Sequence, residues 1–143
     1  MKLLPLILLV FITCWTEATK FVASGSIQCD MPGQTWCFVL TLIEIDIFYD
    51  DLLAATGTQC TSNKSWPYHL EGKDYDDGVF DNAYEVGLHV KHNCTTHGGM
   101  YDLLHDAGTY PIYIEKISVE WSPVLNDKGN HFISESYRSF VFD

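Results

Sequence analysis

Residues 84–94 constrain the fold of this chain more than any other stretch, because hydrophobic and polar side chains alternate along them. One side of the alternation carries Tyr84, Val86, Leu88, Val90 and His92, and the other carries Glu85, Gly87, His89 and Lys91. A period of two is that of a β-strand with one buried face. Cys94 follows the last inward position, so we predict that this strand ties the core to a covalent crosslink.

The first 18 residues have the features of a secretory signal peptide. A basic residue, Lys2, precedes an apolar run at 3–12, and residues 16–18 offer small side chains for cleavage. The run is about half as long as the roughly 20 apolar residues that a transmembrane helix needs. We therefore expect cleavage after Ala18 and a secreted, extracellular protein without a transmembrane segment, whose single domain is residues 19–143.

The size and charge of the mature chain limit its partners. Its 125 residues suffice for one domain with a core of its own. They carry seven basic and eighteen acidic side chains, which gives a formal charge of −11. Nucleic-acid binding needs clustered lysine and arginine, and Arg138 is the single arginine of the sequence. We therefore expect no nucleic-acid partner.

The cysteine count predicts two disulfides. Cys14 lies in the signal peptide, so the mature chain keeps Cys29, Cys37, Cys60 and Cys94. An even number of cysteines in a secreted chain is typical of a disulfide framework. Four cysteines allow three connectivities, and their spacing does not choose among them.

Turn residues divide the mature chain into short segments with strand-like alternation. We expect strands at 21–29, 41–49, 55–61, 66–70, 84–92, 110–121 and 132–142. In the second of these, Ile43, Ile45, Ile47 and Tyr49 form an aliphatic face. In the sixth, a change of parity near 115–116 indicates a bulge.

The segments between these strands complete the predicted fold. Residues 50–54 indicate a turn or a single helical turn, 73–82 an acidic loop, and 95–108 a loop containing Gly98-Gly99. About seven short strands without a convincing amphipathic helix predict an all-β fold, namely an antiparallel β-sandwich. A partly open β-barrel is the alternative that the same pattern satisfies.

Several blocks of the sequence resemble the nematode transthyretin-like family. They are Gly25 to Cys29, Tyr49-Asp50, Asp51 to Ala54, the aromatic-x-x-x-Leu-x-Gly pattern at Trp66 to Gly72, and His92-Asn93-Cys94. The resemblance covers roughly residues 24–121, and the order of the blocks is more specific than any one of them. It implies a small secreted β-sandwich with the transthyretin (prealbumin-like) topology.

The departures from this family bear on the cysteines. The family usually has His-Asp-Cys where this chain has His92-Asn93-Cys94, and its later cysteines are missing here. On the family's fold, Cys37 and Cys60 lie on what should be neighbouring strands. The resemblance thus implies a Cys37–Cys60 disulfide, which leaves Cys29 and Cys94 for each other.

The transthyretin fold also includes 5-hydroxyisourate hydrolases, which are the alternative function that we consider. Those enzymes resemble one another in an early histidine, an arginine in mid-chain and a C-terminal Tyr-Arg-Gly-Ser. This chain has Tyr137-Arg138-Ser139 without the glycine, and no histidine precedes His69. We therefore expect no enzyme activity and assign no catalytic residue.

Two groups of side chains suggest metal binding, and we expect neither to bind a metal. His89 and His92 are three apart on a strand and face opposite sides, so they cannot share a zinc ion; His92 should be hydrogen-bonded at the core edge and His89 solvated. Asp74, Asp76, Asp77 and Asp81 suggest calcium, but Gly78 comes fifth rather than sixth and no glutamate follows at the twelfth position, unlike an EF-hand. We favour a solvated acidic loop, and expect no cofactor.

Asn63-Lys64-Ser65 and Asn93-Cys94-Thr95 are sequons for N-glycosylation. Asn63 lies in a predicted turn, which suits a glycan. Asn93 is a poorer candidate, because disulfide formation at Cys94 competes with the transferase.

The aromatic content, 14%, is high for so small a core. One hypothesis is that Trp66 and Tyr68 lie in a groove or exposed patch that binds an apolar ligand or partner, and the alternative is that they fill the sandwich. We expect an extracellular binding module for a small hydrophobic ligand or a protein or cell-surface partner, with an oligomer as a possible carrier form. A recognition protein would use the loops 73–82 and 95–108.

Overall fold

The structure is a computed structural model that describes residues 18–31, 33–46, 49–75 and 83–131. Every regular element of these residues is a β-strand. The strands are β1 (Thr19–Gln28), β2 (Trp36–Glu44), β3 (Asp51–Ala55), β4 (Gln59–Thr61), β5 (Ser65–Asp74), β6 (Ala83–His92), β7 (Tyr101–Pro111), β8 (Lys116–Glu120) and β9 (Asn130–His131). The described residues contain no helix long and apolar enough to span a lipid bilayer.

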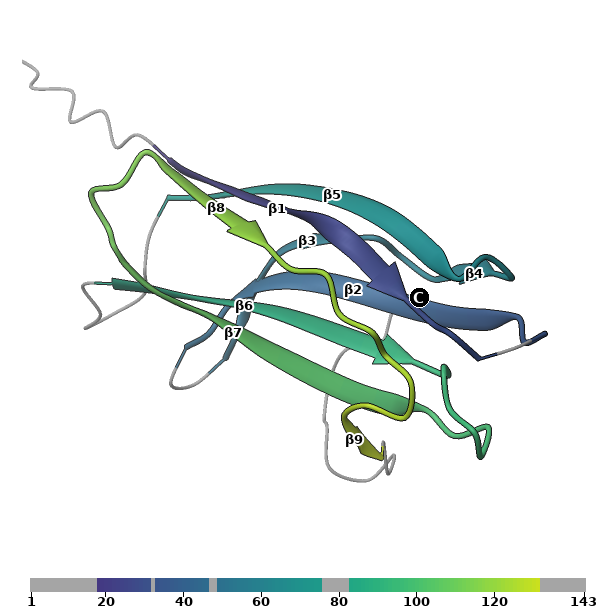
Figure 1. Ribbon diagram of the computed structural model, residues 1–143. Coiled ribbons are helices and arrows are strands. Elements are labelled where there is room, and N and C mark those ends of the chain that lie inside the picture. Colours follow the sequence, from purple (N-terminus) through teal and green to yellow (C-terminus); the bar gives the residue numbers. More distant parts are fainter. Residues whose placement is uncertain (1–17, 32, 47–48, 76–82, 132–143) are drawn as a thin grey trace, which may run out of the picture.

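The strands form two sheets packed face to face (Figure 1). The smaller sheet has the order β5-β1-β8, and the larger has the order β3-β2-β6-β7-β9 with β4 also paired to β2. All pairs are antiparallel except β1 with β8, which is parallel. The prediction of an all-β fold with antiparallel sheets is confirmed.

The central strand, β6, has the alternation that the sequence predicts. The inward row is buried along its whole length and comprises Tyr84, Val86, Leu88, Val90 and His92. The inward row of β2 lies beside it and comprises Trp36, Phe38, Leu40 and Leu42. Residues of β1 meet these rows from the opposite sheet, as in the edge-on contact of the Phe21 and Tyr84 rings, whose centroids are 5.0 Å apart. Burial of this shared apolar surface is the main force that holds the sheets together.

The two sheets approach closely along one side of the sandwich. A Cβ on Gly72 of β5 would lie 2.7 Å from the carbonyl oxygen of Leu53 on β3, so only glycine fits there. On the other side, between β7 and β8, the rings of His105 and Trp121 stack with centroids 4.8 Å apart. Each side of the core is thus covered by contacts between the two sheets.

The strand expected at 41–49 lies earlier in the chain, because β2 spans Trp36–Glu44. The alternation gives this strand an aliphatic and a mixed face without assigning either to the core, and the structure places its even-numbered residues toward the interior. The side chains of Ile45 and Ile43 lie over Gly87 of β6, where a Cβ would lie 2.9 Å from Ile45 and 3.3 Å from Ile43. The large aromatic and leucine side chains from Trp36 to Leu42 fill the space between the sheets, and they place the even-numbered residues of β2 on the inward face. Ile47 lies outside the described residues.

Residues 50–54 are not a helical turn, because Asp51–Ala55 forms β3 and pairs with β2. The expected strand at 55–61 is reduced to β4 (Gln59–Thr61). Pairing with β2 overrides the local preference of the acidic and alanine residues in β3. The pattern of residues within one segment does not show which other strand will pair with it.

The expected loop at 95–108 and the expected single strand at 110–121 are also wrong. Residues 101–111 form β7, and the chain then crosses to β8 in the other sheet. The parity change near 115–116 is therefore a crossover between sheets and not a bulge. The inward positions of β7 include His105 and Ala107, whose polar or small side chains hide the period of two. The expected final strand, 132–142, and the signal peptide residues 1–17 lie outside the described residues.

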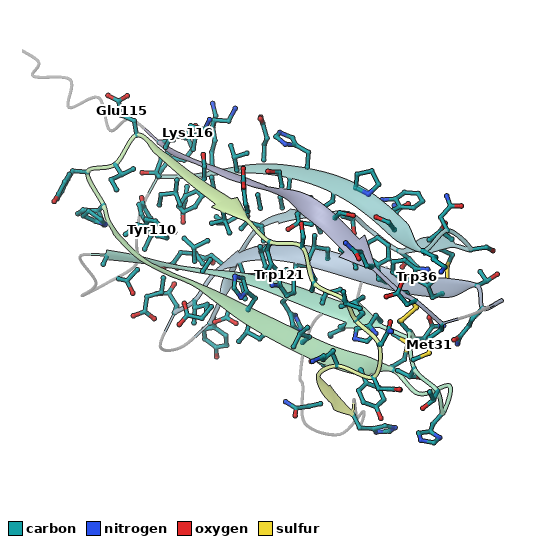
Figure 2. The ribbon with its side chains drawn as sticks, viewed as in Figure 1. Met31, Trp36, Tyr110, Glu115, Lys116 and Trp121 are labelled. Carbon is teal, nitrogen blue, oxygen red and sulfur yellow. A yellow bond between two sulfur atoms is a disulfide. The ribbon has the colours of Figure 1, made fainter. Side chains whose placement is uncertain are left out.

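Two disulfides lie at one end of the sandwich, near Trp36 and Met31 in Figure 2. The structure pairs Cys29 with Cys94 and Cys37 with Cys60, the pairing that the family resemblance implied. The first is buried and joins the end of β1 to the end of β6, hence one sheet to the other. The second joins directly opposed residues of β2 and β4 within one sheet. We call this the disulfide end.

The two disulfides should contribute unequally to stability. The Cys29–Cys94 bond spans 65 residues and the Cys37–Cys60 bond spans 23. The longer loop restricts the unfolded chain more, so replacing both cysteines of a pair by alanine should lower the free energy of unfolding by about 4 kcal/mol for the first and about 3 kcal/mol for the second. Urea unfolding under oxidising conditions measures both. A larger loss for the Cys37/Cys60 pair would contradict this assignment.

Candidate functional site

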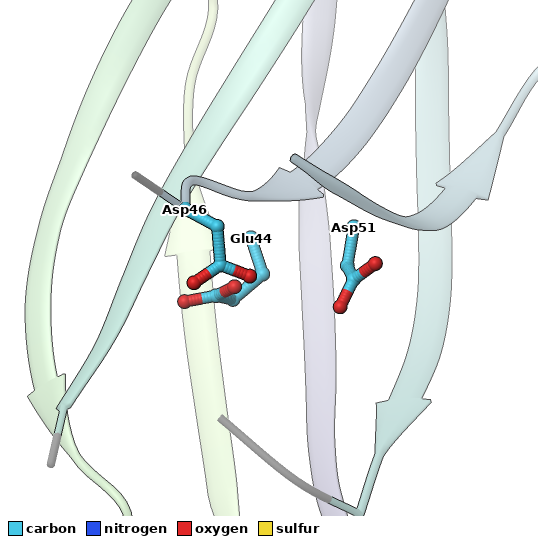
Figure 3. Close-up of side chains that lie close together, drawn as sticks. All are labelled: Glu44, Asp46 and Asp51. Carbon is cyan, nitrogen blue, oxygen red and sulfur yellow. The ribbon is translucent and has the colours of Figure 1, made fainter. Parts of the chain in front are cut away.

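Three carboxyl groups lie close together in Figure 3. They are at the end of β2 opposite the one that carries Cys37, hence opposite the disulfide end. They belong to Glu44, Asp46 and Asp51, and one oxygen of each lies within 4.8 Å of the other two. We call these three residues the carboxylate cluster. Metal ions in proteins are bound by acidic, histidine and cysteine side chains. Among the described residues, the carboxylate cluster is the group of such side chains that lies close enough together to hold an ion.

The strand register brings the cluster together. Glu44 is the last residue of β2 and continues its inward row, so its side chain is buried. Asp51 is the first residue of β3 and pairs directly with Glu44. Asp46 lies in the connection between the strands, where its backbone N–H donates to the Asp50 carboxylate at 3.3 Å. Two strand ends and the start of one loop thus converge.

Only one of the two oxygens of the Glu44 carboxyl group has a hydrogen-bond donor among the described residues. Its Oε1 accepts a hydrogen bond from the backbone N–H of Glu85 at 3.2 Å. Its Oε2 is buried, and no donor among the described residues reaches it. Burial raises the pKa of Glu44 to about 8, and the nearby Asp46 carboxylate adds to this effect. Burial, followed by the charge of Asp74, also raises the pKa of Asp51.

Sequence reasoning missed this cluster. The signal was the position of Glu44 in the same alternation as Trp36 to Leu42, but the alternation is recognised only from Thr41 onward, which leaves Glu44 on a mixed face. The acidic loop was considered for calcium instead. Of the residues of that loop, Asp74 is the last residue of β5 and lies near enough to Asp51 for its charge to raise the pKa of Asp51. Asp76, Asp77 and Asp81 lie outside the described residues.

Exposed tyrosines surround the same end of the molecule. Tyr49 lies just before β3, Tyr75 just after β5, and Tyr113 in the connection from β7 to β8, and they are 84%, 67% and 84% exposed. We call this the loop end, defined by residues 45–46, 49–50, 75 and 112–115. Its large aromatic side chains are not part of the core.

Among the described residues, the group of side chains spaced for a metal ion contains no histidine. His92 is buried, its Nε2 donates to the carbonyl oxygen of Lys128 at 2.9 Å, and its Nδ1 accepts from the backbone N–H of Cys94 at 3.2 Å. The prediction of a hydrogen-bonded histidine at the core edge is confirmed. His89 faces the other side of β6, as expected, but it is not solvated: it is mostly buried and pairs with Asp102.

Trp66 and Tyr68 belong to the packed interior. Tyr68 is only 7% exposed, and its hydroxyl donates to the carbonyl oxygen of Trp121 at 2.7 Å. Trp66 is partly buried and meets the Phe38 ring edge-on. The expectation of an exposed patch is therefore wrong for Tyr68, because the inward face of β5 carries it into the core. The alternative, sandwich filling, describes both side chains.

The two sequons differ in their surroundings. Asn63 is exposed in the turn between β4 and β5. Asn93 is half-buried, and its side-chain oxygen accepts a hydrogen bond from the backbone N–H of Cys37 at 2.7 Å. This contact holds the start of β2 against the end of β6. Tyr137-Arg138-Ser139, the partial hydrolase motif, lies outside the described residues.

Substitutions of Tyr68 should affect stability. Tyr68→Phe removes a buried hydrogen bond and should lower the free energy of unfolding by about 1 kcal/mol. Tyr68→Ala leaves a cavity as well and should lower it by about 3–5 kcal/mol. The matched control is Tyr113→Ala, which should change it by less than about 0.5 kcal/mol because that ring is exposed. Equal effects of the two alanine variants in urea unfolding would exclude a core role for Tyr68.

His92 should make stability depend on pH. Burial lowers the pKa of His92, so the folded protein binds fewer protons than the unfolded chain below about pH 6.5. The contribution of neutral His92 is complete above that pH and is lost as the pH falls toward the lowered pKa. The stability difference between wild type and His92→Gln should therefore shrink from pH 7.5 to pH 5. The raised pKa of Glu44 makes stability change with pH in the opposite direction, but this effect is the same in wild type and variant and cancels in their difference. The control is His97→Gln, because the side chain of His97 is exposed.

Comparisons with known proteins identify the family of the chain. No solved structure matches it. It is similar to a Caenorhabditis elegans relative described as an uncharacterized protein, with 30% identity over 76 residues that cover 53% of this chain and 56% of the relative. The chain thus spans about half the length of that relative. Residues 24–131 match the family described as Caenorhabditis elegans protein of unknown function (DUF870), so the chain belongs to this nematode family.

Proposed function

We propose that this protein is a secreted, extracellular binding module with a transthyretin-like β-sandwich, and that it recognises a protein or cell-surface partner through its loop end. The observation that carries the proposal is that Tyr49, Tyr75 and Tyr113 lie in or beside the connections at that end, all with exposed rings. The two-sheet architecture and the order of its strands are compatible with the transthyretin topology.

The distribution of crosslinks and connections supports recognition at this end. Both disulfides lie at the disulfide end, where they fix β1, β2, β4 and the end of β6. The connections at the loop end carry no disulfide among the described residues. Rigid sandwiches commonly bind partners through connections at one end, because these vary without disturbing the core. Disulfides of this kind suit a secreted protein.

Tyrosine suits such a surface for a physical reason. Its ring offers a large apolar area with little loss of conformational entropy, and its hydroxyl still forms hydrogen bonds. Large exposed rings gathered at one end mark an interaction site more often than rings scattered singly. Since the chain carries a formal charge of −11, a basic partner surface would be attracted to this end.

Of the two kinds of binding module, recognition is better supported than transport. A carrier of a small hydrophobic ligand needs apolar side chains around an enclosed space. Tyr68, the side chain expected to line such a space, packs in the core and is hydrogen-bonded to Trp121. The tyrosines of the loop end face solvent instead. We therefore propose binding rather than catalysis, and a glycan on exposed Asn63 is compatible with it.

The test compares binding of secreted variants to intact nematode cells. The full chain is expressed in a eukaryotic secreting host, and mass spectrometry checks cleavage after Ala18 and glycan mass at Asn63. The triple variant Tyr49→Ala/Tyr75→Ala/Tyr113→Ala should bind at least about tenfold more weakly, because aromatic anchors dominate recognition. The control is Leu104→Ala, whose side chain is 55% exposed on β7, away from the loop end.

The outcomes separate the hypotheses. Unchanged binding of the triple variant, with the fold verified by circular dichroism, would refute recognition through the loop end. Native mass spectrometry of wild type distinguishes the carrier: an oligomer with a discrete retained mass would favour transport of a small ligand. A protein retained inside the producing cells would refute secretion.

A further inference from the structure

We propose that the carboxylate cluster, Glu44, Asp46 and Asp51, is a binding site for a calcium ion. This inference goes beyond the proposed function and does not depend on it, since the ion would bind whether or not the loop end recognises a partner. Figure 3 shows the carboxyl groups of Glu44 and Asp46 close together and that of Asp51 beside them, supplied by the end of β2, the following connection and the start of β3.

The first argument is the unpaired oxygen of Glu44. This side chain is fully buried, yet Oε2 has no hydrogen-bond donor among the described residues, while Oε1 is used by the N–H of Glu85. A buried carboxylate without a partner is strongly unfavourable, so native proteins supply a cation, a proton or a donor. A cation bound between the three carboxyl groups would satisfy Oε2 and remove their mutual repulsion.

The second argument is the kind and spacing of the ligand atoms. The cluster offers only oxygen atoms, the ligands that hard cations prefer, and no thiolate or imidazole that would favour zinc. The three atoms lie within 4.8 Å of one another. Calcium–oxygen distances of about 2.3–2.6 Å place opposite ligands about 5 Å apart, whereas magnesium requires about 4 Å and a strict octahedron. Atoms within 4.8 Å of one another can all reach one calcium ion, and the flexible coordination of calcium tolerates an irregular arrangement better than that of magnesium.

The third argument is the graded exposure of the three side chains. Glu44 is buried, Asp46 is half-buried and Asp51 is exposed. An ion can thus enter from the Asp51 side and keep water molecules as its remaining ligands. Sites with few protein ligands and several waters bind calcium weakly, and dissociation constants of about 0.1–1 mM are typical of extracellular modules.

The competing explanation is a proton shared between Glu44 and Asp46. A shared proton would satisfy those two carboxyl groups and would make no use of Asp51. A calcium ion would use all three. The contribution of Asp51 therefore distinguishes the two explanations, and its exposed position makes Asp51→Asn compatible with the fold.

The experiment measures calcium binding by the full mature chain at pH 7.4. Isothermal titration calorimetry gives the dissociation constant, and thermal unfolding in calcium chloride is compared with magnesium chloride and with sodium chloride of equal ionic strength. Calcium at ten times the dissociation constant should raise Tm by about 5 °C, whereas the other salts should not. Asp51→Asn and Glu44→Gln should each weaken calcium binding at least about tenfold. Asp30→Asn, an exposed aspartate at the disulfide end, is the charge-matched control and should leave binding unchanged.

Each outcome decides the proposal. Absence of a calcium-specific heat and Tm shift in wild type would overturn it, and stabilisation by Glu44→Gln in the same series would then point to the shared proton. Equal affinities of wild type and Asp51→Asn would also overturn it, because the ion would bind elsewhere. Normal calcium binding by the triple tyrosine variant, together with lost cell binding, would show that this site and the proposed recognition surface are separate.

Discussion

The paired inward rows of β2 and β6 are the constraint on which the rest of the structure depends. In their register, Phe38 lies opposite His92, Leu40 opposite Val90, and Leu42 opposite Leu88. The opposite sheet and the Cys29–Cys94 crosslink are both positioned by these rows. The last pair of the series is Glu44 with Val86, so the periodicity that builds the core also carries a carboxyl group into its edge.

The sequence predicts those parts of the fold where local pattern and tertiary packing agree. The strand around Leu88 alternates cleanly and is buried as expected, and the hydrogen bonds of His92 follow from its place at the end of the inward row. The strand expected from Thr41 onward begins earlier, at Trp36, and the sequence does not show which of its aliphatic and mixed faces is inward. The strand containing His105 is missed because half of its inward side chains are polar or small.

The carboxylate cluster illustrates the same limit. An acidic residue within an apolar run is ordinarily assigned to the solvent face, which outweighed the position of Glu44 in the alternation from Trp36 to Leu42. Its proximity to Asp51 depends on a register that only the folded sheet defines. Crosslinks fix one end of the sandwich, whereas the carboxylate cluster and the exposed tyrosine rings lie at the other. Under the two proposals above, one end of the protein supplies stability and the other end supplies its interactions.

The parallel pairing of β1 with β8 has a consequence for how the chain folds. The two strands are the first and nearly the last of those described, and their partners, such as Phe21 and Ile117, are almost a hundred residues apart. Such non-local pairing raises the contact order and slows folding. During synthesis, the edge of β1 that pairs with β8 stays unpaired until most of the chain has been made. In that period β1 is open to aggregation and to chaperone binding. Completion of the smaller sheet is therefore a late event in the biogenesis of the protein.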